Sequence, residues 1–239
     1  MEHIDKTLNQ LVEKLRDAHG KRLRSVILYG SGATGEIHGA HSDLNVFCVL
    51  DGVTPKDLGA AEAVFQWWRE KGNPAPLLLS TDEVRTSTDC FPIEFHDIVE
   101  RHKVLFGDDV THTLQIDDRF YRAQVEHELR AKQLRLRQKA AGVLGAKELL
   151  LRLMTDSVST FCVLGRHALR LGGFDAPWTK SAIVASLRES FGIEGRAFDT
   201  LLSLRQGTTR SRDEVPLDLF QMYLDDIAAL VAAVDKLDS

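Results

Sequence analysis

Two apolar segments joined by a glycine-rich polar stretch constrain the fold of this chain more than any other feature of its sequence. Residues 25–29 read Ser-Val-Ile-Leu-Tyr and end at Gly30-Ser31, and residues 43–50 read Asp-Leu-Asn-Val-Phe-Cys-Val-Leu. Short apolar runs that are bounded by glycine and polar residues are typical of buried β-strands. The sequence therefore predicts two strands with a turn after the first.

The second strand is expected to present two oxygen-bearing side chains on one face. In an extended strand, residues i and i+2 point to the same side of the sheet. Asp43 and Asn45 therefore share a face, while Leu44 and Val46 face the core. A buried carboxylate at Asp43 is costly unless a cation accompanies it.

The rest of the chain divides into a mixed half and a helical half. The first half predicts helices near residues 4–15 and 58–68, strands at 75–80 and 91–98, and a short fifth element that ends at Gly107. After Asp117 only helices are expected, at residues 118–141, 147–171, 179–191, 195–205 and 216–237. We therefore expect an α+β chain, with an α/β domain over residues 1–115 and an all-helical bundle domain over residues 116–239.

The composition is that of an ordinary globular protein with a core. The 239 residues are 44% hydrophobic and 27% charged, and the net charge is −5. This charge excludes a strongly basic surface overall, so nucleic acid is not an expected partner. The longest apolar run, residues 227–234, is too short to span a bilayer, and the N-terminus does not resemble a signal peptide. The three cysteines are far apart and form no CxxC pair, so we expect a cytoplasmic protein without a membrane partner.

The Gly30-Ser31 turn has the composition of a phosphate-binding loop. Glycine lets a phosphate approach the backbone, the start of a helix offers free N–H groups and partial positive charge, and a serine hydroxyl donates a hydrogen bond. Opposite this turn, Asp43 and Asn45 offer hard oxygen ligands of the kind that magnesium prefers. A nucleoside triphosphate with Mg²⁺ is therefore the expected ligand.

The segment LYGSGATGEIHGAHSDLN, residues 28–45, resembles the signature of the nucleotidyltransferase superfamily related to DNA polymerase beta, which includes aminoglycoside and minimal nucleotidyltransferases. The signature is a hydrophobic strand, Gly-Ser, a spacer, and then acid–hydrophobic–acid, with a third acid on a later strand. The positions that match are Gly30, Ser31, Gly35, Ser42, Asp43 and Leu44. The resemblance covers residues 1–107 and implies a nucleotidyltransferase-type mixed sheet with flanking helices. It also implies nucleotide binding by Gly30, Ser31 and Ser42.

The chain departs from the signature at Asn45, where the family has a second acid. The family uses both acids to hold two metal ions, whereas asparagine offers one neutral carbonyl oxygen. For the third acid, Glu94 in the expected strand 91–98 is favoured, and Asp97, on the other face of that strand, is the alternative. The resemblance thus implies Asp43, Asn45 and Glu94 as catalytic residues and metal ligands. Glu94 acts as a ligand or as a general base.

A basic helix in the second half offers two more candidate residues. Arg130 and Arg137 are seven residues apart and share a helix face. If that face borders the expected nucleotide site, the two guanidinium groups neutralise the charge of the triphosphate. Otherwise they belong to a solvated face, with Glu126 and Glu128 as partners.

Two functions are consistent with these residues. The first is an enzyme that transfers a nucleoside monophosphate from a nucleoside triphosphate to a hydroxyl acceptor, which the sequence does not identify, and releases pyrophosphate. The second is a catalytically impaired protein of the same fold that binds a nucleotide or a protein partner, a second copy of itself included. Asn45 favours the second function, whereas the retained Gly30-Ser31 and Asp43 favour the first.

Overall fold

The computed structural model describes residues 2–34, 44–208 and 215–237, and the chain forms two compact units, Met1–Asp118 and Arg119–Ser239. The α+β class is confirmed, since strands and helices mix in the first unit. The elements of that unit are α1 (Glu2–His19), β1 (Leu23–Tyr29), β2 (Asn45–Leu50), α2 (Pro55–Glu70), β3 (Leu77–Ser80), α3 (Thr81–Thr86), α4 (Pro92–Glu100) and β4 (His102–Gly107). Short 3₁₀ turns lie at Gly20–Arg22, Gly30–Thr34 and Val110–Thr113, and a fourth, Asp118–Phe120, leads into the second unit.

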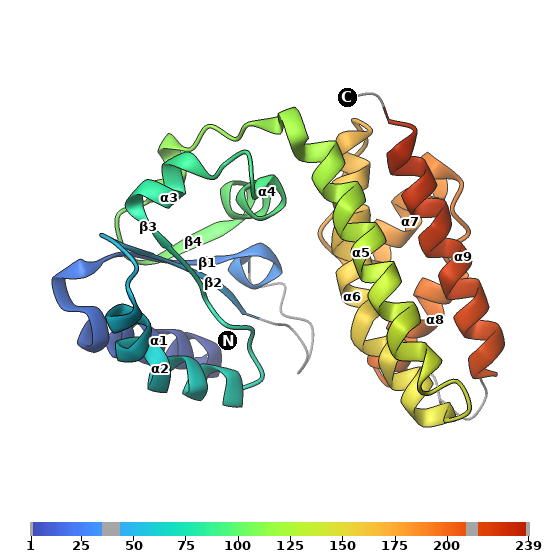
Figure 1. The fold of residues 1–239 in the computed structure, drawn as a ribbon, viewed down its shortest axis with the longest axis horizontal. Helices are drawn as coiled ribbons and strands as arrows, with labels where there is room; N and C mark the ends of the chain where they lie inside the picture. The colour runs from blue at the N-terminus through green and yellow to red at the C-terminus, as the bar shows by residue number, and fades with distance from the viewer. Residues whose placement is uncertain (1, 35–43, 209–214, 238–239) are drawn as a thin grey trace. The chain divides into compact units, whose positions relative to one another are not determined.

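The four strands form one mixed sheet in the order β3-β2-β1-β4. The central strand β1 runs antiparallel to β2 and β4, and β3 runs parallel to β2. Helices α1 and α2 cover one face of the sheet, and α3 and α4 cover the other (Figure 1). The sheet is therefore a middle layer with an apolar core on each side.

The predicted alternation of β2 is confirmed. Leu44 and Val46 lie in the core beneath α1 and α2, while Phe47 and Val49 lie in the core beneath α3 and α4. Asn45 has the same parity as Phe47, so it faces the side of the sheet that carries α3 and α4. Cys48 is fully buried in the first core.

Local sequence signals fix the helix ends in this unit. Thr54 caps α2 in a capping box, in which the Asp57 carboxylate accepts a hydrogen bond from the Thr54 amide at 2.9 Å. Arg22 then reaches the same carboxylate at 3.1 Å, so the turn before β1 is tied to the first turn of α2. Helix α1 ends at His19, and Gly20 after it adopts a left-handed backbone with φ 54°, as is common at helix C-termini.

The strand predicted at residues 91–98 is wrong, because these residues form helix α4. The strand pattern required Phe91 to be buried and His96 to lie on the opposite, polar face. Instead Phe91 is 45% exposed, and His96 is buried beside Phe95. Pro92 occupies the first helical turn, where its fixed φ and missing N–H suit a helix start. The sheet strand of this region is β4, which follows four residues after the end of the predicted strand.

The second unit contains helices as its only regular α or β elements within residues 119–208 and 215–237. They are α5 (Tyr121–Ala141), α6 (Lys147–Leu171), α7 (Lys180–Phe191), α8 (Arg196–Arg205) and α9 (Pro216–Asp235). Long helices α5, α6 and α9 pack side by side (Figure 1). Within the described ranges, no helix combines the length and apolar character that crossing a bilayer requires.

Candidate active site

Three side chains line up across the sheet where β1 ends. Tyr29, the last residue of β1, is the register partner of Asn45 on β2 and of His102 on β4. Residues directly opposite each other in antiparallel strands point to the same face, with Cβ atoms about 5 Å apart. Asn45, Tyr29 and His102 thus form a row, which we call the three-strand row, on the face that carries α3 and α4.

Glu94 reaches this row from α4. Burial raises the pKa of the Tyr29 phenol to about 12, and the negative charge of Glu94 contributes to the increase. The phenol is therefore neutral at physiological pH and lies within electrostatic reach of the Glu94 carboxylate. The half-buried Glu94 side chain approaches the row from a helix rather than from the predicted strand.

The turn after β1 differs in part from the expected phosphate loop. Gly30 adopts φ 74°, a left-handed conformation, and a Cβ built on it would lie 3.6 Å from Asn45 Nδ2. Its amide is engaged, since it donates a hydrogen bond of 2.9 Å to the Arg101 carbonyl and so continues the pairing of β1 with β4. A Cβ at this distance from Asn45 Nδ2 would make only an ordinary contact, so the left-handed φ is what favours glycine here. The Gly30 N–H group is not open to a phosphate. The residues that follow start a 3₁₀ turn, Gly30–Thr34, and no α-helix lies within its five residues.

The roles of the remaining predicted site residues stay predictions. Ser42 and Asp43 lie outside the described residues, so their roles stay predictions, as does that of the Ser31 hydroxyl. Arg130 donates to Glu126 at 2.7 Å and lies 3.7 Å from Asp235, and Arg137 is exposed on α5. Nucleotide binding by these two arginines also stays a prediction.

The helix changes the relation between the two candidates for the third acid. On a strand, Glu94 and Asp97 would point to opposite faces, but on α4 they are three residues apart and share a face. The strand next to β2 does not supply an acid either, because β3, described in full, consists of Leu77, Leu78, Leu79 and Ser80. Both candidates for the third acid, Glu94 and Asp97, thus lie on α4.

No family model and no characterised protein matches this sequence. Among solved structures, spectinomycin adenyltransferase AAD(9) from Enterococcus faecialis, crystallised with ATP and spectinomycin, has a similar fold. The similarity has a TM-score of 0.59 at 13% identity and covers 97% of this chain and 99% of the other. The chain therefore shares its fold with this adenyltransferase.

Two toxin–antitoxin structures are similar over less of the chain. A toxin–antitoxin with AMP-PNP covers 42% of this chain and 74% of its own, with 20% identity and a TM-score of 0.30. A tri-AMPylated HEPN toxin from Shewanella oneidensis in complex with an MNT antitoxin covers 45% and 74%, with 19% identity and a TM-score of 0.29. The fold assignment rests on the adenyltransferase comparison.

The described residues do not form a complete metal site by themselves. Within residues 2–34, 44–208 and 215–237, no group of three or more His, Cys, Asp or Glu side chains is arranged to hold a metal ion. Asn45 offers one neutral oxygen, and Glu94 offers a carboxylate beside Tyr29. Metal binding by Asp43, Asn45 and Glu94 therefore stays a prediction.

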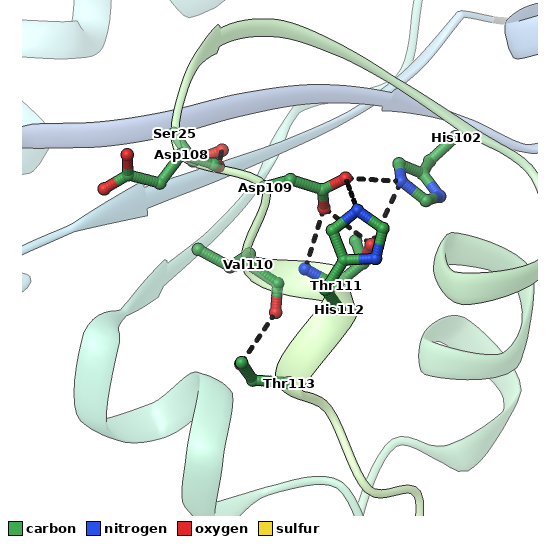
Figure 2. Close-up of polar contacts among 8 residues, drawn as sticks. All are labelled: Ser25, His102, Asp108, Asp109, Val110, Thr111, His112 and Thr113. Carbon is green, nitrogen blue, oxygen red and sulfur yellow. Dashed lines mark hydrogen bonds and ion pairs between the residues drawn. The ribbon is translucent and has the colours of Figure 1, made fainter.

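A polar cluster beside the three-strand row was not predicted from the sequence. The Asp109 carboxylate lies 3.1 Å from both His102 Nε2 and His112 Nε2, and it accepts hydrogen bonds from the Thr111 amide and hydroxyl (Figure 2). Burial acts to raise the pKa of Asp109. The hydrogen bonds from Thr111 and His102 outweigh this effect and lower the pKa to about 2. The spacing Asp-x-Thr, in which the carboxylate caps the following turn, is the local signal that could have indicated this cluster.

This low pKa predicts how Asp109 contributes to stability as the pH changes. Since the folded pKa of about 2 lies below the ordinary value of 3.8, the contribution is complete above about pH 4 and is lost as the pH falls toward 2. Asp109→Asn should therefore destabilise the first unit at pH 7 and have little effect near pH 2. Urea unfolding between these pH values measures the difference. Asp108→Asn is the control, because Asp108 is exposed and binds Ser25 through its backbone carbonyl (Figure 2). An effect of Asp109→Asn that is equal at both pH values would contradict the prediction.

Proposed function

We propose that this chain binds ATP at the end of β1 and transfers its adenylyl group to a hydroxyl acceptor, releasing pyrophosphate. The observation that carries the proposal is the left-handed backbone of Gly30 next to Asn45, at the strand end where the signature predicts a triphosphate. The fold shared with an adenyltransferase crystallised with ATP supports the choice of nucleotide. The acceptor is a hydroxyl compound that neither the sequence nor the fold identifies.

In this proposal Asp43, Asn45 and Glu94 hold magnesium together with the triphosphate. The ion, when bound, neutralises phosphate charge and lowers the cost of the developing charge on pyrophosphate. Ser31 and Ser42 donate hydrogen bonds to the phosphates. The neutral Tyr29 phenol, which lies between Asn45 and His102, is a further hydrogen-bond donor for this site.

A second candidate function has specific support in the site. Asn45 removes one charge from the ligand set, and β3 contributes only leucines and a serine beside β2. A protein with this ligand set could bind a nucleotide without transferring it. It would then act as a nucleotide-binding module or bind a protein partner or a second copy of itself.

Calorimetric titration tests the proposal. We expect ATP to bind to the wild type with magnesium and much more weakly without it. Glu94→Gln should weaken binding about tenfold, as expected for one lost charge at a partly buried site. Glu100→Gln, on the exposed end of the same helix, should leave the affinity unchanged. Absence of ATP binding to the wild type would reject both the adenylyl transferase and the ATP-binding module. Only the role of a protein-binding module would then remain.

A further inference from the structure

His102, a member of the three-strand row, pairs with Asp109 in a polar cluster that the predicted site does not include. His102 is directly opposite Tyr29, so its imidazole lies on the same face as Asn45 and Glu94. The backbone places it close to the Gly30 turn as well, because the preceding residue, Arg101, accepts the Gly30 hydrogen bond. Its side chain is 19% exposed, so a substrate can reach part of the ring.

Asp109 determines which nitrogen of His102 carries a proton. The Asp109 carboxylate is ionised at neutral pH and acts only as an acceptor. Thr111 donates to one carboxylate oxygen at 2.6 Å, and His102 Nε2 lies 3.1 Å from the other. The proton of the neutral imidazole therefore sits on Nε2, which leaves Nδ1 unprotonated. In Figure 2 the second ring nitrogen of His102 is on the ring edge that points away from Asp109.

We infer that His102 is the general base of the adenylyl transfer and that Asp109 is the residue that positions it. His102 Nδ1 takes the proton from the acceptor hydroxyl while the hydroxyl oxygen forms a bond to the α-phosphorus of ATP. The bond from that phosphorus to the oxygen that bridges to the β-phosphate breaks, and its electron pair leaves with pyrophosphate. This inference rests on the proposed function, and it assigns Glu94 to ligand binding rather than to proton transfer.

The first arm of the test measures the protonation of His102. In nitrogen-15 spectra of histidine-labelled protein at neutral pH, His102 should show the Nε2–H form with an unprotonated Nδ1. Asp109→Asn should replace this signature with a mixture of the two neutral forms, because an amide can donate as well as accept. A wild-type His102 protonated on Nδ1 instead would overturn the inference.

The second arm measures pyrophosphate release from ATP and magnesium with water as the acceptor, since water has the O–H group that the base must deprotonate. His102→Gln should lower the release rate about 100-fold without changing ATP affinity, as expected for loss of a general base. Imidazole added to His102→Gly should restore part of the rate, which a purely structural role would not allow. His112→Gln is the matched control, because His112 contacts the same Asp109 oxygen but is 79% exposed, and it should keep the wild-type rate.

The outcomes separate this inference from the proposed function. Wild-type rates in His102→Gln would overturn the role of His102 and leave the proposed transfer in place. ATP binding without pyrophosphate release in the wild type would instead overturn the proposed transfer, and the role of His102 with it. Equal losses of ATP affinity and rate in His102→Gln would show that His102 supports binding, which contradicts its assignment as the base.

Discussion

Asn45→Asp is expected to tighten magnesium-dependent ATP binding about 10- to 100-fold and to raise the rate of pyrophosphate release. The two side chains have nearly equal volume, so the packing of residue 45 against Gly30 need not change. The gain is electrostatic, because a full negative charge then faces a divalent ion in a partly desolvated site. The expected change corresponds to about 1.4–2.8 kcal/mol. It is less than the roughly 4 kcal/mol by which two unit charges 4 Å apart attract at an effective dielectric constant near 20, because the carboxylate also loses hydration. Calorimetry and a pyrophosphate assay with and without magnesium measure the two effects.

Two controls show whether this gain belongs to a metal site. Asp43→Ala in the Asn45→Asp background should abolish both effects, since it removes the predicted first acid. Asn9→Asp makes the same chemical change on the exposed surface of α1 and should have no effect. If the site no longer binds a cation, the new carboxylate meets Glu94 without one, and like-charge repulsion lowers the melting temperature. A destabilised Asn45→Asp that magnesium and ATP do not rescue would contradict the enzyme interpretation.

Gly107→Ala should cause the largest loss of stability in the first unit, at least about 3 kcal/mol. Gly107 ends β4 with φ 77°, and a Cβ placed there would lie 1.9 Å from the Arg24 carbonyl oxygen. Since that oxygen belongs to the backbone of β1, the two strands would have to separate. The same pairing places His102 opposite Tyr29, so the substitution should also disturb the three-strand row.

Gly72→Ala separates the clash from the backbone strain. Gly72 has a similar φ of 84°, but no atom lies within 4 Å of a Cβ built there. Its substitution should cost only the left-handed strain of alanine, about 1–2 kcal/mol. Urea unfolding, followed by hydrogen exchange of the β1 amides, measures both variants. Equal destabilisation by the two alanines would show that the contact with Arg24 is unimportant.

The helices of the second unit were predictable because each is long and bounded by clear signals. The predicted helix 147–171 has the bounds of α6, and α7, α8 and α9 begin within one residue of the prediction. Apolar residues recur with helical spacing over many turns in these segments, so tertiary contacts and local preference agree. The orientation of the side chains on β2 was also predictable. Because successive strand residues point to opposite faces, Leu44 and Val46 had to lie on the same side of the sheet.

The region around α4 was not predictable from the same kind of pattern. Phe91, Ile93 and Phe95 alternate over a short segment, and a stretch of this length fits a strand or a helix equally well. In the observed helix His96 is buried, whereas the predicted strand placed it on the polar face. Its Nε2 lies 2.6 Å from the Asp118 carboxylate, and the sequence could not have supplied that partner from 22 residues away.

The candidate site was predictable only where it depends on neighbouring residues in the sequence. The Gly30 turn and the orientation of Asn45 follow from the local pattern. In contrast, two features depend on the pairing of β1 with β4. They are the hydrogen bond from the Gly30 amide to the Arg101 carbonyl and the position of His102. The sequence separation between these strands, residues 23–29 and 102–107, hides that pairing from any local pattern.

The central claim, that ATP binds where β1 ends, is tested most directly by the paramagnetic effect of Mn²⁺-ATP on the spectrum of the protein. Manganese replaces magnesium with the nucleotide and broadens the signals of nearby nuclei. We expect selective broadening of the amides of Gly30, Asn45 and His102, while Leu23, about 20 Å away at the other end of β1, stays sharp. Broadening that is uniform, or strongest at Leu23 or in the helical unit, would contradict the account.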